Sequence, residues 1–136
     1  MLEKLIGGRL NRKKYIMYYL AVVVTSVFLM MAFSALMLAT GQLDYAEGGT
    51  MYMVGVVIGL FANLATAVLG IRRLHDLGKG GKWVLAVLVP SVLSFCVYFF
   101  DNNILTNLVS ALDIAVIMAL AVMKGNDGAN EFGPAN

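Results

Sequence analysis

Charged residues are scarce in this sequence: Asp, Glu, Lys and Arg together make up 13% of its 136 residues. A soluble domain carries about 25% charged residues, so the composition argues against a water-soluble fold. Apolar residues are correspondingly abundant, at 60% of the chain, and the mean hydropathy is +0.82. The length suits one compact domain. We therefore expect a single integral membrane domain over residues 1–136.

Cysteine and histidine each occur only once, as Cys96 and His75. A single cysteine excludes an intrachain disulfide, and this pair cannot supply the clustered ligands of a zinc site. The stretch 78–82 is not a phosphate-binding loop either, because Lys82 is followed by Trp83 rather than by Ser or Thr. We expect no metal ion, no cofactor and no nucleic-acid partner.

Long apolar stretches divide the chain, each close to the length of about 20 residues that crosses a bilayer as a helix. Backbone groups cannot stay unpaired in lipid, so each stretch is predicted to be helical. The first stretch follows basic residues, as in a signal peptide. However, residues 15–43 carry no charge, and this run is longer than a signal core of about 7–15 residues. We expect a retained anchor. The predicted fold is an all-α membrane protein, a bundle of four transmembrane helices near residues 15–39, 51–71, 83–100 and 104–123.

All ten Lys and Arg residues fall in three segments, residues 1–14, residues 72–82 and the tail from residue 124. In the two other gaps between apolar stretches the only charged residues are acids, Asp44 and Glu47 in one gap and Asp101 in the other. Lys and Arg are kept in the cytoplasm when helical membrane proteins insert. The alternation therefore predicts that the loop 72–82, the tail 124–136 and both termini are cytoplasmic, which is an N-in/C-in topology.

Two glycines in the second stretch, Gly55 and Gly59, form a GxxxG pair. Small residues at this spacing allow two helix backbones to approach closely. The pair is compatible with a dimerisation face. It favours packing within the bundle, because four helices of the same chain are available.

Two polar side chains lie deep in apolar stretches, Asn63 in the second and Asp113 near the middle of the fourth. A charged Asp at this depth costs about 2.5–3.5 kcal/mol on insertion scales. One hypothesis is a proton- or cation-coupled site in a small transporter or channel. The other is an Asp that is protonated or hydrogen-bonded to Asn63, Ser94 or a free carbonyl of the third stretch. A single acid favours the second hypothesis.

The densest group of polar residues is Arg72-Arg73-Leu74-His75-Asp76, which is followed by Trp83 after a short loop of Gly and Lys. A catalytic triad through His75 would need a nucleophile that nothing in the sequence identifies. We therefore expect no enzymatic activity. An enzyme that acts on a lipid or membrane-bound substrate through His75 and Asp76 is the third functional hypothesis.

This motif is flanked by two others. Gly8-Arg9-x-x-Arg12-x-x-Tyr15 opens the first span, and Gly125-x-x-Gly128-x-Asn130-x-Phe132-Gly133-Pro134 follows the fourth. In this order, with the spans between them, the three motifs resemble the YhaH-like bacterial inner-membrane proteins, a family known as domain of unknown function number 805. The resemblance covers nearly the whole chain. It implies a multi-pass protein of the bacterial inner membrane, and it implies no reaction.

The three motifs are all predicted to be cytoplasmic, so they can meet at one end of the bundle. The predicted cluster comprises Arg9, Arg12, Arg72, Arg73, His75, Asp76, Lys79, Asn130 and Glu131. In a structural interpretation, Asp76 pairs with Arg9 or Arg12 and ties the N-terminal segment to the loop. In a functional one, the cluster binds anionic lipid headgroups or a protein partner. We expect a non-enzymatic binding protein, with membrane lipids, a protein partner or a second copy of the chain as candidates. The alternative is a small oligomeric transporter or channel with Asp113 in its path.

Overall fold

The computed structural model describes residues 7–46, 48–97, 99 and 102–134. Four α-helices make up most of this part: α2 (Arg12–Ala39), α3 (Thr50–Asp76), α4 (Leu85–Val97) and α5 (Asn103–Val122). A short 3-10 helix, η1 (Gly81–Val84), precedes α4. Helices α2, α3 and α5 are long and apolar enough to cross a membrane, and α4 is a shorter apolar helix. The predicted all-α membrane bundle of four helices is confirmed.

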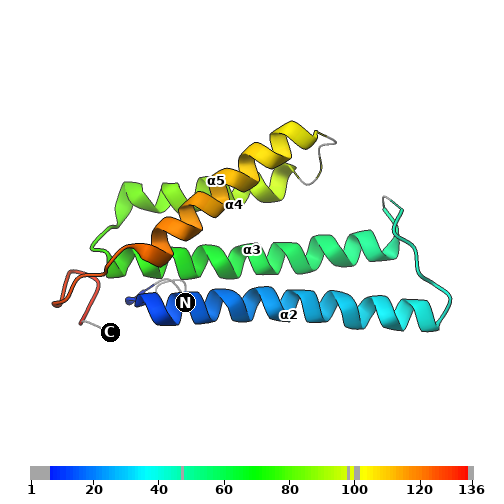
Figure 1. Cartoon of the computed structure of the whole chain (residues 1–136), viewed down its shortest axis with the longest axis horizontal. Helices are drawn as coiled ribbons and strands as arrows, with labels where there is room; N and C mark the ends of the chain where they lie inside the picture. Colours follow the sequence, from blue (N-terminus) through cyan, green and yellow to red (C-terminus); the bar gives the residue numbers. More distant parts are fainter. Residues whose placement is uncertain (1–6, 47, 98, 100–101, 135–136) are drawn as a thin grey trace.

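The helices form two antiparallel hairpins (Figure 1). Helix α2 lies along α3, and the α4–α5 hairpin packs against α3 on the other side. The N-terminal segment, the α3–α4 connection and the C-terminal tail all lie at one end of the bundle (Figure 1). Residues 7–14, 72–84 and 123–134 lie there and contain all the described Lys and Arg residues, so we call it the basic end. The α2–α3 connection lies at the opposite end.

Helix α3 is longer than the predicted span 51–71, because it continues to Asp76. The residues from Arg72 to Asp76 are therefore not part of a loop, which corrects the predicted loop 72–82. The helix ends at a glycine, Gly78, with a φ of 66°. The backbone N–H of Lys79 donates to Leu74 O at 2.9 Å, and that of Gly78 donates to His75 O at 3.1 Å. This pair of hydrogen bonds is the glycine-dependent Schellman end of an α-helix.

Helix α4 is shorter than the predicted span 83–100. Its regular part covers Leu85–Val97, with η1 in front of it. Residues 98, 100 and 101, and so the acid Asp101 in the gap between the third and fourth stretches, lie outside the described residues. At 1.5 Å per residue, 13 residues extend for about 20 Å, against about 30 Å for a hydrocarbon core. Pro90 lies inside α4 without ending it.

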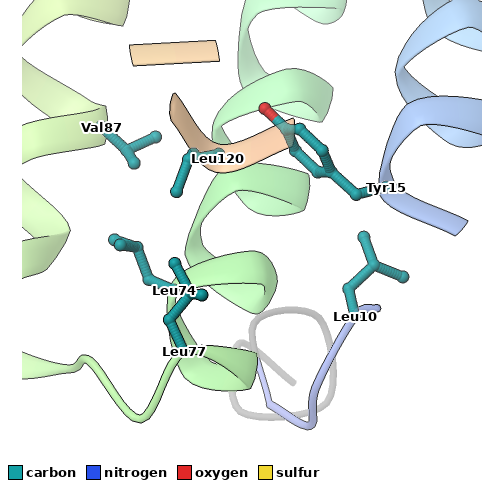
Figure 2. Packing of buried hydrophobic residues seen from close by; sticks show 6 residues of the cluster. All are labelled: Leu10, Tyr15, Leu74, Leu77, Val87 and Leu120. Carbon is teal, nitrogen blue, oxygen red and sulfur yellow. The ribbon is translucent and has the colours of Figure 1, made fainter. Parts of the chain in front are cut away.

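The buried apolar core lies at the basic end. It brings together side chains from the N-terminal segment and all four helices (Figure 2): Leu10, Tyr15, Leu74, Leu77, Val87 and Leu120. The tightest helix contact in this region is at Gly70, where a Cβ atom would lie 2.7 Å from Val87 Cγ1. A Cβ atom on Gly59 would meet no atom of the described chain within 4 Å. The close glycine contact between helices of the described chain is therefore at Gly70, outside the GxxxG pair.

Away from this core, large apolar side chains cover the outside of the bundle. Phe28 on α2 and Phe61 on α3 are each 68% exposed. Soluble monomers rarely expose apolar patches of this extent. Such a surface is the one that a bilayer would cover.

Candidate functional site

Three charged side chains are buried together at the basic end. Arg73 is 0% exposed, Arg9 2% and Asp76 3%. Arg9 Nε donates to Asp76 Oδ1 at 3.1 Å, and Arg73 Nη1 donates to Asp76 Oδ2. We call Arg9, Arg73 and Asp76 the clamp. A single carboxylate thus serves two guanidinium groups, and the remaining donors of both need other acceptors.

Arg73 finds those acceptors mainly at the end of α5. Its Nε donates to Leu120 O at 2.9 Å, and its Nη2 donates to Met123 O. The last carbonyls of an α-helix have no partner within the helix and carry the negative end of its dipole, so a cation is stabilising there. Nη1 also donates to Leu10 O at 3.3 Å. One side chain of α3 therefore caps α5 and holds the N-terminal segment.

Arg9 binds the tail in the same way. Its Nη2 donates to Asn126 O and its Nη1 to Gly128 O, each at 2.5 Å. The tail is also tied through the backbone, where Asn126 N–H donates to Asp76 O at 2.9 Å. The N-terminal segment, the end of α3 and the tail are thus joined through one buried group of charges and carbonyls.

His75 makes a second connection between the first and third motifs. Its ring stacks on Phe132, with 4.1 Å between ring centroids and 2° between ring planes. Its Nδ1 lies 3.3 Å from Gly8 O. The Asn130 amide donates to His75 O at 2.9 Å, and Asn130 Oδ1 accepts from Phe132 N–H at 2.9 Å. These contacts assign His75 and Asn130 a role in holding the tail.

A glycine makes the tail fit the clamp. A Cβ atom on Gly125 would lie 2.0 Å from Asp76 Oδ2 and 2.8 Å from Asp76 Cγ. Gly80 is similarly confined, since its Cβ atom would lie 2.5 Å from Phe132 Cζ. The sequence marks Gly125 as part of a motif, but it does not show that the glycine faces Asp76.

The clamp changes which cations are available to an external anion. Arg9 and Arg73 are candidates for anion binding in the sequence, but in the structure their anion is Asp76. Apart from Arg72, the described cations that stay exposed or half-exposed form what we call the basic rim: Arg12, Lys13, Lys14, Lys79, Lys82 and Lys124.

Contacts with neighbouring groups define the positions of three side chains of the rim. Arg12 Nη1 donates to Val122 O at 3.3 Å, beside the end of α5. Lys79 Nζ lies 4.4 Å from the centre of the Trp83 ring. Lys124 pairs with Asp127 at 2.7 Å on the exposed surface of the tail.

Arg72 differs from its neighbour Arg73. Its backbone carbonyl accepts from Leu10 N–H at 3.0 Å. Its Nε is buried and has no hydrogen-bond partner among the described residues. The side chain is half-buried beside Gly8, 4.0 Å from the position of a Cβ atom there. Arg72 therefore lies between the clamp and the rim.

The two intramembrane polar residues are held apart from this cluster. Asn63 donates from Nδ2 to Ser91 O at 2.8 Å, which links α3 to α4. Asp113 lines a small pocket that also contains Tyr15, Tyr19 and Ser91. The amide of Asn63 is thus used on the α4 backbone, rather than on Asp113.

The comparisons agree with the sequence motifs. A family model described as a protein of unknown function, DUF805, matches residues 6–134. This range contains all three motifs and every helix of the structure. No curated protein and no solved structure matches the chain.

Proposed function

The chain belongs to the DUF805 family, whose function is unknown, and we propose that its basic end binds anionic lipid headgroups. The chain is a small multi-pass membrane protein by its apolar helices. In this proposal the role is non-enzymatic, the membrane is the bacterial inner membrane, and the basic end faces the cytoplasm.

The observation that carries this proposal is the position of the basic rim. The clamp brings three segments that are distant in sequence to one end of the bundle, and six cations around it stay exposed or half-exposed. A Lys or Arg near an anionic membrane surface contributes about 1 kcal/mol of attraction. The rim cations share one end, so their attractions act on the same leaflet.

Trp83 supports the same placement. It is 54% exposed and lies under Lys79 at the start of the α4 segment. Trp is enriched at the membrane–water interface, where its apolar ring lies at the level of the headgroups. The rim and Trp83 would therefore lie in the headgroup layer of one leaflet.

Trp83 is the only tryptophan of the chain, so its fluorescence reports on this surface. In nanodiscs, raising the fraction of phosphatidylglycerol in phosphatidylcholine should shift the Trp83 emission of the wild type. A triple variant, Lys13→Gln/Lys14→Gln/Lys124→Gln, should show a much smaller emission shift at the same phosphatidylglycerol fraction, because three charges at about 1 kcal/mol each are lost. The response should weaken in high salt, which screens exposed charges.

The matched control changes charge at the opposite end. Asp44→Asn alters the α2–α3 connection and should leave the lipid titration unchanged. An emission that responds equally to both lipids, or a triple variant that titrates like the wild type, would refute headgroup binding. A wild type that ignores lipid but retains a protein during purification would favour the protein-partner hypothesis.

The orientation has its own test. In a Cys96→Ser background, Ala129→Cys marks the basic end and Gln42→Cys marks the opposite end; both positions are exposed. An impermeant maleimide should label Gln42→Cys in intact cells, and Ala129→Cys only after the inner membrane is opened. The reverse pattern would place the basic end outside and contradict the N-in/C-in topology.

A further inference from the structure

A second polar site lies inside the bundle, apart from the basic rim. It is a pocket between all four helices whose oxygen-bearing lining side chains are Tyr15, Tyr19, Thr66, Ser91 and Asp113. For the centre of a water-sized species, its volume is about 10 Å³. This space suffices for one water molecule or one small ion, and it excludes an organic ligand.

Two of the hydroxyl-bearing lining residues are buried as whole residues. Tyr15 is 2% exposed and Ser91 is 7% exposed. Neither hydroxyl makes a hydrogen bond to a described residue, although the backbone carbonyl of Ser91 accepts from Asn63. Polar groups in the interior of a helix bundle are normally satisfied by protein, water or an ion. Figure 2 shows the Tyr15 ring reaching from α2 into the bundle.

The charge of the pocket indicates which occupant, water or an ion, it is suited to bind. Asp113 accepts no hydrogen bond from a described residue, and none of the lining residues is basic. The titratable groups that face it are Tyr15 and Tyr19 of α2, while α3 and α4 offer the hydroxyls of Thr66 and Ser91. A carboxylate at this depth needs a compensating positive charge.

We propose that this pocket binds one monovalent cation, a sodium ion or a proton, on Asp113. One carboxylate neutralises one positive charge, whereas a divalent ion would leave a net charge inside the membrane. Carboxylate and hydroxyl oxygens are suitable ligands for a hard cation, and the same oxygens can hold a water molecule on a protonated Asp113. This site does not depend on the lipid-binding function proposed for the basic end.

The test measures thermal unfolding of the full chain, purified in detergent. Sodium chloride replaces choline chloride at constant ionic strength, and a second series varies pH from about 5 to 9 in choline chloride alone. A cation that binds only the folded chain raises its midpoint by mass action, and we expect a shift of roughly 5 °C. A response in the first series identifies sodium, and a response only in the second identifies a proton. Asp113→Asn should abolish the response.

Tyr15→Phe keeps the inference testable if Asp113→Asn does not fold. It removes one oxygen and retains the ring in the core. For a sodium response it should raise the half-saturating concentration roughly 10-fold, the factor that 1.4 kcal/mol represents. For a proton response it should shift the pH midpoint. Tyr18→Phe is the matched control, because Tyr18 is 41% exposed and does not line the pocket. A wild type that responds to neither series, or one that responds as Asp113→Asn does, would overturn the inference.

Discussion

Replacing Asp76 with alanine should destabilise the folded chain by about 3–5 kcal/mol, the largest single-residue effect that we expect. The substitution leaves the guanidinium groups of Arg9 and Arg73 buried without their shared anion. Their carbonyl partners remain, but carbonyl dipoles do not neutralise two full charges. Chemical denaturation of the purified protein in detergent measures the change in the free energy of unfolding.

Asp127→Ala is the matched control for this experiment. It also removes a carboxylate from an i,i+3 ion pair at the basic end, but the side chains of Asp127 and Lys124 are 80% and 70% exposed. Exposed pairs contribute about 0–1 kcal/mol, so this variant should unfold close to the wild type. Equal effects of Asp76→Ala and Asp127→Ala would mean that the buried pairs do not hold the tail.

The helical regions could be predicted from hydropathy, but their ends at the basic end could not. A charged residue normally marks the end of a membrane span, so Arg72 places the predicted end of α3 too early. At this end of the helix Asp76 pairs with Arg9 of the N-terminal segment, and Arg73 donates to the Leu120 carbonyl of α5. Those partners are distant in sequence, and hydropathy averaged along the chain cannot include them.

The candidate site, too, could be predicted only in part from the sequence. The cluster around Asp76 is visible in the sequence, because dense Arg, His and Asp residues are rare in such an apolar chain. The sequence predicts that Asp76 pairs with Arg9 or Arg12; in the structure it pairs with Arg9, and Arg73 is a second partner that the sequence analysis does not predict. Which cations are buried and which form the rim follows from the approach of α5 and the tail.

Glycine packing shows most clearly what cannot be predicted from residue spacing alone. Gly55 and Gly59 match a local motif, yet no part of the described chain lies near the position of a Cβ atom on Gly59. Gly70 belongs to no such pair and lies against Val87 of α4. A spacing rule shows that a helix can be approached closely, but only the arrangement of the neighbouring helices decides where this happens.

Gly125→Ala should be the second most destabilising substitution, with a loss of about 2–3 kcal/mol in the free energy of unfolding. The added Cβ atom would lie 2.0 Å from Asp76 Oδ2 and 3.2 Å from Arg73 Nη1. Asp76 is held by two arginines, so it cannot move away without lengthening an ion pair. The tail must therefore shift, which weakens the hydrogen bonds that Arg9 donates to it. Denaturation in detergent measures the loss, and proteolysis should cut the tail of the variant more rapidly.

Gly128→Ala separates this steric effect from a general effect of alanine in the tail. A Cβ atom on Gly128 meets nothing within 4 Å, and its carbonyl still accepts from Arg9 after the substitution. This variant should match the wild type in both measurements. If Gly125→Ala were equally harmless, the tail would have room to leave Asp76 without loss of stability, and the clamp would not be what holds it. If only Gly125→Ala is harmful, the motif glycine is required because the tail backbone passes directly over a buried carboxylate.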